Sequence, residues 1–302
     1  MYYGSGTVGS QTFTFDFDTG SSDTFVPGPT CGTAQGCVGT TKYNQQGVDE
    51  HNTTSITYGS GSVSGENYYD SVTIAGLTAT HQNVISLTQA TGFSNSASDG
   101  LMGMAFESIA NSKQPPYFLT LINEKKVSNP EFSFYLGRGA DGTGKNSEMT
   151  LGGRDSSKYT GAFTTVPVTK QGYWQVALDE VVVNGFVDPV DTLLTKGQAA
   201  IDNGTTLVLA PLLAATSIFA RVPGAIPVPL ELINGALEPV LYIYPCAATP
   251  KVAIDFGRKD FEIAPQDFSL GSLTGDFASI VGNNTLATVL DSLEYCLAGI
   301  AA

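Results

Sequence analysis

The sequence of 302 residues has few charged side chains, and basic ones are scarcest. Only 14% of its residues are charged, and 14 lysines and arginines face 28 acidic residues, which gives a formal net charge of −14. Nucleic acids and anionic membranes select basic surfaces, so this balance argues against either one as a partner. The sequence has no apolar run of about 18 residues or more, and we therefore expect no transmembrane helix.

Histidine and cysteine are also scarce. There are only two histidines, and no Cys-x-x-Cys pair stands near them, so we expect no zinc site. The four cysteines form two pairs by spacing, Cys31 with Cys37 and Cys246 with Cys296. We predict two disulfides and hence an oxidising compartment, and four reduced, buried cysteines are the alternative.

A chain with so few basic residues cannot depend on many ion pairs for its stability. At low pH its carboxylates protonate and its self-repulsion falls, so the composition suits an acidic medium. Many neutral extracellular proteins share this profile, and composition alone leaves adaptation to acid open. The hydrophobic fraction of 42% and the aromatic fraction of 10% are typical of a folded protein with one or two domains.

Short strand-like runs dominate the chain. Residues 12–17, 131–135 and 162–166 alternate apolar with polar side chains, and turn dipeptides such as Asn-Gly separate many of the runs. Helical patterns are few and short, and we expect them at residues 117–126, 212–220 and 286–293. The pattern as a whole predicts an all-β protein.

One pattern occurs twice, far apart: an apolar residue, Asp, a small polar residue, Gly and two hydroxyl residues. The first copy covers residues 17–22 and contains Asp18, and the second covers residues 201–206 and contains Asp202. Each copy falls in its own half of the chain. We therefore predict two domains, residues 1–168 and residues 169–302, each with one copy.

A single Asp-Thr-Gly tripeptide indicates no more than a turn, but two copies with hydroxyl residues after them indicate paired carboxylates. Two aspartates held within about 3 Å of each other cannot both ionise, so one can take a proton from water while the other donates one. Glycine lets the backbone approach the carboxylates closely, and the hydroxyl that follows can bind an outer carboxylate oxygen. Such a pair would activate water.

At these motifs the sequence resembles the pepsin-like aspartic proteases of eukaryotes, in their fungal type, over nearly the whole chain. The resemblance implies an all-β, bilobal fold with a cleft between two β-rich lobes, and endopeptidase activity at acidic pH. It implies that Asp18 and Asp202 are the catalytic pair, without a covalent intermediate, cofactor or metal. Six residues would support this pair: Thr19, Gly20, Ser21, Asn203, Gly204 and Thr205.

The resemblance also covers the substrate side of the site. Residues 56–61 resemble the flap hairpin of this family, and residues 99–104 resemble the segment beneath its first catalytic loop. The residues implied in binding an extended peptide or protein substrate are Tyr58, Gly59, Ser60 and Thr206. Both cysteine pairs fall where the family has disulfides. The resemblance further implies a monomer that is secreted or resides in an acidic vacuole.

Three departures from the family pattern bear on activity. Asn203 stands where the family has threonine or serine, so we expect the two catalytic aspartates to be held less tightly. Phe25 stands where the family usually has a tryptophan whose indole N–H donates to the flap tyrosine. We also expect no signal peptide in this sequence, and its first residues correspond to the middle of the first strand of the family. At the other end, the family pattern continues with an apolar-Gly segment after Cys296. Residues 280–283 resemble that segment only superficially. A non-catalytic, peptide-binding protein or an inactive truncated product is therefore the alternative.

Overall fold

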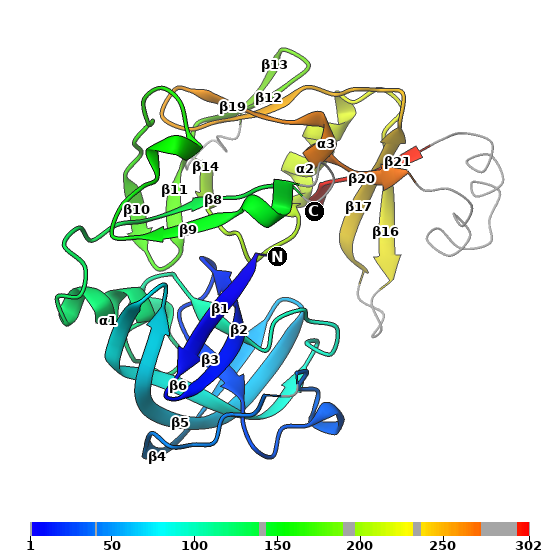
Figure 1. Ribbon diagram of the computed structural model, residues 1–302. Helices are drawn as coiled ribbons and strands as arrows, with labels where there is room; N and C mark the ends of the chain where they lie inside the picture. The colour runs from blue at the N-terminus through cyan, green and yellow to red at the C-terminus, as the bar shows by residue number, and fades with distance from the viewer. Residues whose placement is uncertain are drawn as a thin grey trace. The chain divides into compact units, whose positions relative to one another are not determined.

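The computed structural model describes residues 2–39, 41–138, 143–189, 197–231, 237–272 and 295–301 (Figure 1). Strands far outnumber helices in these residues, and the all-β class predicted from the alternating runs is confirmed. The helix expected at residues 286–293 and the segment 280–283 lie outside the described residues.

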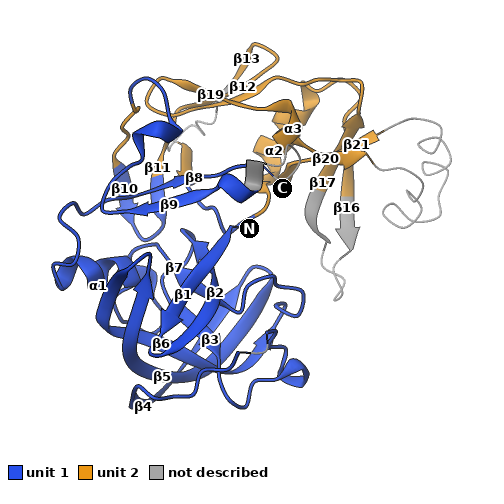
Figure 2. Ribbon diagram, in the orientation of Figure 1, with its two compact units in different colours: residues 1–162, 168–175, 200–205 blue, residues 163–167, 176–199, 206–302 orange. Residues whose placement is uncertain are grey.

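The chain forms two compact units, as expected for a bilobal protein (Figure 2). Unit 1 contains residues 1–162, 168–175 and 200–205, and unit 2 contains residues 163–167, 176–199 and 206–302. The loop with Asp202 therefore belongs to unit 1, together with the loop that carries Asp18. The division of the chain after residue 168 stays a prediction.

Unit 1 is built on a seven-stranded sheet with the order β1-β2-β7-β3-β6-β5-β4. The strands are β1 (Tyr3–Val8), β2 (Gln11–Asp18), β3 (Thr24–Pro27), β4 (Val48–Tyr58), β5 (Gly61–Ile74), β6 (Leu77–Thr91) and β7 (Gly100–Gly103). The alternating run at residues 12–17 lies inside β2, as predicted. Strand β7 enters between β2 and β3, parallel to β2 and antiparallel to β3.

Both faces of this sheet are covered. On one face Phe13, Phe15 and Phe17 of β2 pack with helix α1 (Tyr117–Asn123), whose Leu121 is fully buried. On the other face a second cluster contains Leu101, Phe25 and Ile85, on β7, β3 and β6, and the disulfide of Cys31 and Cys37. Side chains of a strand alternate between the faces, so the residues between the phenylalanines of β2 face this second cluster.

The remaining parts of unit 1 are short. The run at residues 131–135 forms β8 (Phe132–Tyr135), which pairs with β9 (Glu148–Leu151). Single helical turns are η1 (Thr33–Gln35), η2 (Glu107–Ile109), η3 (Thr143–Asn146) and η4 (Ser156–Lys158). Both histidines are exposed.

The strand predicted at residues 162–166 is wrong: these residues have no regular structure, and β10 begins after them (Val168–Gln171). Gly161 before the run has a φ of 78°, and Pro167 after it has no N–H to donate to a sheet. Phe163 is 52% exposed, so the alternating pattern has no buried face to pack against.

Unit 2 contains two four-stranded sheets. One has the order β13-β12-β18-β19, and the other has the order β16-β17-β21-β20. Their strands are β12 (Glu180–Val183), β13 (Phe186–Pro189), β16 (Ile226–Glu231), β17 (Leu237–Pro245), β18 (Val252–Asp255), β19 (Asp260–Ile263), β20 (Ser269–Ser272) and β21 (Tyr295–Ala298). Helices α2 (Leu212–Ala220) and α3 (Pro265–Phe268) contribute Phe219 and Phe268 to the core of this unit.

Four short strands complete the described fold. Strand β15 (Val208–Leu209) pairs in parallel with β22 (Ile300–Ala301). Strands β11 (Trp174–Leu178) and β14 (Gly197–Ala200) form a three-stranded sheet with β10. The helices predicted at residues 117–126 and 212–220 are confirmed as α1 and α2, the first of them ending three residues earlier.

Both predicted disulfides are present, Cys31–Cys37 in unit 1 and Cys246–Cys296 in unit 2. The second bond joins the end of the β17 region to β21 across 50 residues of sequence. The described residues contain no helix that is long and apolar enough to cross a membrane.

Candidate active site

The first copy of the repeated motif is a loop between β2 and β3. Asp18 is the last residue of β2, and its side chain is only 6% exposed. The Gly20 N–H donates to its Oδ1 at 2.7 Å, and the Ser21 hydroxyl donates to its Oδ2 at 2.5 Å. Both carboxylate oxygens of Asp18 are thus held by groups two and three residues further along the chain.

Strand β7 and Met104 after it hold this loop by backbone hydrogen bonds, as the resemblance of residues 99–104 implied. The Met104 N–H donates to the carbonyl of Asp18 at 2.7 Å, and the Gly103 N–H donates to that of Asp23 at 2.9 Å. Gly103 is required here because a Cβ at this position would lie 2.4 Å from the backbone of Ser22. The Trp174 indole N–H donates to the carbonyl of Met104 at 2.9 Å and so ties the segment to β11.

The second copy repeats the first atom by atom. The Gly204 N–H donates to Oδ1 of Asp202 at 2.8 Å, and the Thr205 hydroxyl donates to its Oδ2 at 2.7 Å. Asp202 is half-buried. Each aspartate therefore accepts one bond from a glycine N–H and one from a hydroxyl, and these bonds fix its orientation.

Hydrogen bonds join the two loops directly. The Thr19 N–H donates to Oδ1 of Asn203 at 2.8 Å, and the Asn203 N–H donates to the Thr19 hydroxyl at 3.1 Å. That hydroxyl lies 3.0 Å from the carbonyl of Ile201, to which it donates. The side-chain Nδ2 of Asn203 is buried and has no partner among the described residues. The Asn203 amide thus accepts the bond that a threonine or serine hydroxyl would accept at this position, but its Nδ2 group remains without an acceptor.

The carboxyl groups of Asp18 and Asp202 interact with each other. The pKa of Asp18 is raised to about 6, mainly by burial; the bonds from Ser21 and Gly20 oppose this rise, and the negative charge of Asp202 adds to it. With this raised pKa, the Asp18 carboxyl keeps its proton in mildly acidic solution.

The predicted flap is a hairpin of β4 and β5 with Gly59 and Ser60 exposed at its tip. The Tyr58 ring packs edge-on against Phe93 and Phe25, at centroid distances of 5.7 and 6.4 Å. Its hydroxyl is buried, and we find no hydrogen-bond partner for it in the described part of the chain. This agrees with the expected loss of a donor where Phe25 replaces tryptophan.

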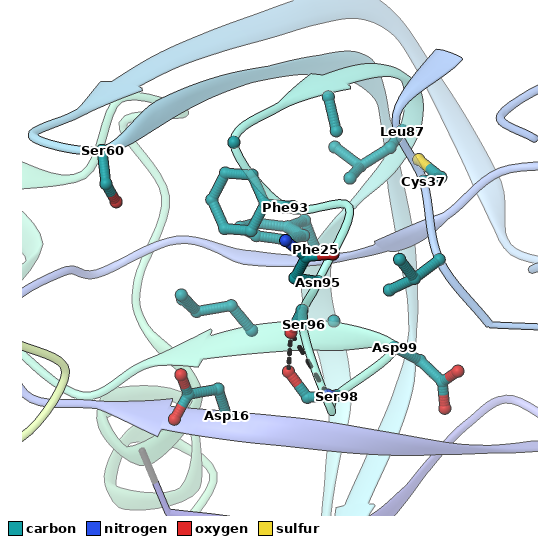
Figure 3. A pocket seen from close by; sticks show the side chains of 15 residues that line it. Asp16, Phe25, Cys37, Ser60, Leu87, Phe93, Asn95, Ser96, Ser98 and Asp99 are labelled. Carbon is teal, nitrogen blue, oxygen red and sulfur yellow. Dashed lines mark hydrogen bonds between the residues drawn. The ribbon is translucent and has the colours of Figure 1, made fainter. Parts of the chain in front are cut away.

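The predicted substrate residue Thr206 is exposed and belongs to unit 2. Two residues beside the pair were missed in the sequence. Phe93 contacts both Phe25 and Tyr58, and Asp16 lines a cavity of about 190 Å³ next to them (Figure 3). The signal for Asp16 was its place two residues before Asp18, which puts both side chains on the same face of β2.

Comparison with known proteins agrees with this geometry. The family described as "Eukaryotic aspartyl protease" matches residues 1–282. An aspartic protease of Phaffia rhodozyma is 38% identical over 287 residues, which are 93% of this chain and 67% of the relative. Cathepsin D of Dictyostelium discoideum is 34% identical, with 89% of this chain and 70% of the relative covered.

Other relatives are longer than the aligned region. Pepsin A of Sus scrofa is 37% identical over 230 residues, which are 72% of this chain and 57% of the relative. The chain belongs to the eukaryotic aspartyl protease family. It is an aspartic-type endopeptidase, which hydrolyses peptide bonds in peptides or proteins.

Proposed function

We propose that Asp18 and Asp202 carry out this hydrolysis as a pair that shares one proton and activates a water molecule. The observation that supports the proposal is the identical set of bonds on the two carboxylates, in two loops tied together by Thr19 and Asn203. Structural aspartates at turns have no need of such matching surroundings. Asp18 is buried and Asp202 is half-buried, and electrostatic interactions are stronger there than in water.

In the proposed reaction the ionised carboxylate takes a proton from water, and the water oxygen adds to the carbonyl carbon of the scissile bond. The protonated carboxyl donates its proton to the carbonyl oxygen, which gives a tetrahedral diol without any bond to the enzyme. A proton then passes from the pair to the peptide nitrogen, a hydroxyl of the diol returns a proton to the pair as the C–N bond breaks, and acid and amine products leave. The pair again holds one proton.

The proposed substrate is an extended peptide that lies between the pair and the flap. The exposed tip residues Gly59 and Ser60 offer backbone groups that can pair with the peptide as an added strand. The aromatic contacts of Tyr58 with Phe25 and Phe93 favour apolar side chains near the scissile bond. Thr206 is proposed to contact the substrate from the second loop.

The proposed setting is an acidic compartment outside the cytosol, reached by secretion or by delivery to a vacuole. Two disulfides and a net charge of −14 support it. The raised pKa of Asp18 supports activity below about pH 6, because the pair loses its shared proton above that value. We further propose that the enzyme acts as a monomer.

Hydrolysis of a denatured protein by the purified chain, with and without pepstatin, tests the proposal. Asp18→Asn and Asp202→Asn should each lower kcat by about a thousandfold or more while the thermal melt persists. Asp260→Asn, an exposed aspartate of β19, is the matched control and should be fully active. Activity in either pair variant, or peptide binding without turnover by the unchanged chain, would contradict the assignment.

A further inference from the structure

Asn52, Thr53 and Thr54 of strand β4 form the pattern Asn-x-Thr, which the proposed catalysis does not use. This pattern marks an asparagine that can accept a glycan where it is accessible, in a protein that passes through the secretory route. Two further copies of the pattern begin at Asn203 and Asn283. Asn283 lies outside the described residues, whereas Asn52 and Asn203 have opposite surroundings.

Asn52 lies in an irregular part of an edge strand. Strand β4 is the last strand of the unit 1 sheet, and in the described part of the chain it pairs with β5 alone. Residues 50–52 of β4 bulge out opposite the single residue Asn67 of β5, and His51 within this bulge has a φ of 55°. Asn52 is exposed. A large group attached to its side chain therefore displaces no strand that the structure describes.

Asn67 binds both ends of the motif from behind the bulge. Its Nδ2 donates to Oδ1 of Asn52 and, at 2.9 Å, to the Thr54 hydroxyl. That hydroxyl donates to Oδ1 of Asn67 at 3.1 Å, and both Asn67 and Thr54 are buried. Asn52 is thus held through its side-chain oxygen, and no described residue accepts a hydrogen bond from its Nδ2.

A carboxylate determines the orientation of these amides. The Glu50 carboxylate can only accept hydrogen bonds, so Asn83 turns its Nδ2 toward it, at 2.5 Å. The same Nδ2 lies 3.4 Å from Oδ1 of Asn67, to which it donates, and Asn67 therefore directs its own Nδ2 to Asn52. Asn52 must then accept with its oxygen. Its Nδ2, the atom that carries the sugar in a glycosylated asparagine, is left unbound in an exposed residue.

We propose that Asn52 is an N-glycosylation site, and that the donor is an oligosaccharide carried by a polyprenyl diphosphate. In the transfer the bond between C1 of the first sugar and a diphosphate oxygen breaks, and C1 forms a bond to Nδ2 of Asn52. Nδ2 gives up one proton and the polyprenyl diphosphate leaves, so nothing is oxidised or reduced. The sugar replaces a hydrogen of Nδ2 only, and the bond from Asn67 to Oδ1 persists in the glycosylated chain.

Asn203 has the same motif but cannot carry a glycan in the folded chain. Its Nδ2 is buried, and its Oδ1 accepts the Thr19 N–H of the other loop at 2.8 Å. A sugar on this nitrogen would have to displace the loop that contains Thr19 and Asp18. We therefore expect folded chains to carry a glycan at Asn52 and none at Asn203.

The proposal rests on the secretory route given under the proposed function, and its test separates modification from catalysis. The full chain is secreted from yeast behind a leader peptide, and its peptides are analysed by mass spectrometry before and after treatment with a peptide-N-glycosidase. This enzyme converts a glycosylated asparagine to aspartate and so marks the modified position. We expect the mark at Asn52 and not at Asn203. Asn52→Gln should lose this glycan, and Thr54→Ser, which keeps the motif and the hydroxyl beside Asn67, should retain it.

Hydrolysis of a denatured protein by the same secreted chain is measured in parallel. A glycan at Asn52 on a chain without activity supports the modification, and only the proposed catalysis then fails. An active chain with an unmodified Asn52 would overturn the modification and leave the catalysis standing. An inactive chain with an unmodified Asn52 would overturn both. Asn52 lies outside the proposed catalytic residues, so Asn52→Gln should keep the kcat/KM of the unchanged chain.

Discussion

A methyl group on Gly204 would lie 2.2 Å from Oδ1 of Asp18. The reciprocal contact is almost as close, since a Cβ on Gly20 would lie 2.5 Å from the carboxyl carbon of Asp202. Each glycine thus lies against the carboxylate of the other loop. The two contacts explain why the repeated motif has glycine in the same place in both copies, although neither residue has a positive φ.

Gly20→Ala and Gly204→Ala should each abolish most of the activity. A methyl group is fixed to the backbone and cannot rotate away, so it must displace the carboxylate of the opposite loop. That displacement breaks the hydrogen bonds that hold Asp18 or Asp202 in place. We expect kcat to fall by about a hundredfold or more, with a folded protein remaining. The measurement is kcat on a peptide substrate, together with a thermal melt. Gly153→Ala is the control, because a Cβ there meets nothing within 4 Å; near-normal kcat in Gly204→Ala would contradict the argument.

Replacement of Asn203 by threonine should stabilise the loops. The Asn203 side chain accepts the Thr19 N–H but buries an Nδ2 without a partner, and a threonine hydroxyl can accept the same bond without the extra donor. We expect the free energy of unfolding to rise by about 1 kcal/mol in Asn203→Thr. Asn203→Ala, which removes the acceptor as well, should lower it by a similar amount. Denaturant titrations measure both, and a less stable Asn203→Thr would show that the amide is well accommodated.

Stability should fall as pH rises from about 4 to about 6. The folded-state pKa of Asp18 is raised above its ordinary value, so in this range the folded chain binds more protons than the unfolded chain. Its contribution to stability is therefore fully present below the unfolded pKa and is lost as pH rises through the folded one. Asp18→Asn should flatten this decline, and Asp16→Asn should do so too, because the pKa of Asp16 is raised in the same direction.

Urea titrations at a series of pH values, with Asp260→Asn as control, check this prediction. An equal slope in Asp18→Asn and in the unchanged chain would contradict it. The activity profile provides a second check, since kcat should fall above about pH 6 as the pair loses its shared proton.

The parts of this protein that could be predicted from sequence depend on local chemistry. The repeated Asp-x-Gly motifs place carboxylates, glycines and hydroxyls within a few residues, so their internal hydrogen bonds follow once each turn forms. The spacing of the cysteines likewise sufficed for both disulfides. In the same way the alternation in residues 12–17 sufficed to predict β2.

The parts that could not be predicted depend on what covers each face. The alternation around Asp16 has the form of a strand with one wet face, but the second hydrophobic cluster covers that face and buries the carboxyl. The same kind of pattern at residues 162–166 has no sheet to join and forms no strand. Nor could the sequence indicate which atom of Asn203 would lack a partner, because that depends on the approach of Thr19 from the other loop.

The two disulfides should differ in their contribution to stability. In the chain-entropy view a disulfide restricts the unfolded chain more when it closes a longer loop, which gives about 4 kcal/mol for the 50-residue separation of Cys246 and Cys296 and about 2 kcal/mol for the six-residue separation of Cys31 and Cys37. Replacing Cys246 and Cys296 with serine should therefore lower the free energy of unfolding more than replacing the other pair.

The two disulfides also lie in different hydrophobic clusters. Cys31 and Cys37 are both buried in the cluster that contains Phe25, against which Tyr58 of the flap packs, so their loss should also raise KM for a peptide substrate. Cys246 and Cys296 lie in the core of unit 2, and their loss should change stability without changing this KM. Thermal melts and peptide hydrolysis of the two double variants separate these effects. A greater loss of stability in the Cys31/Cys37 variant would show that packing in the first cluster outweighs loop closure in the second unit.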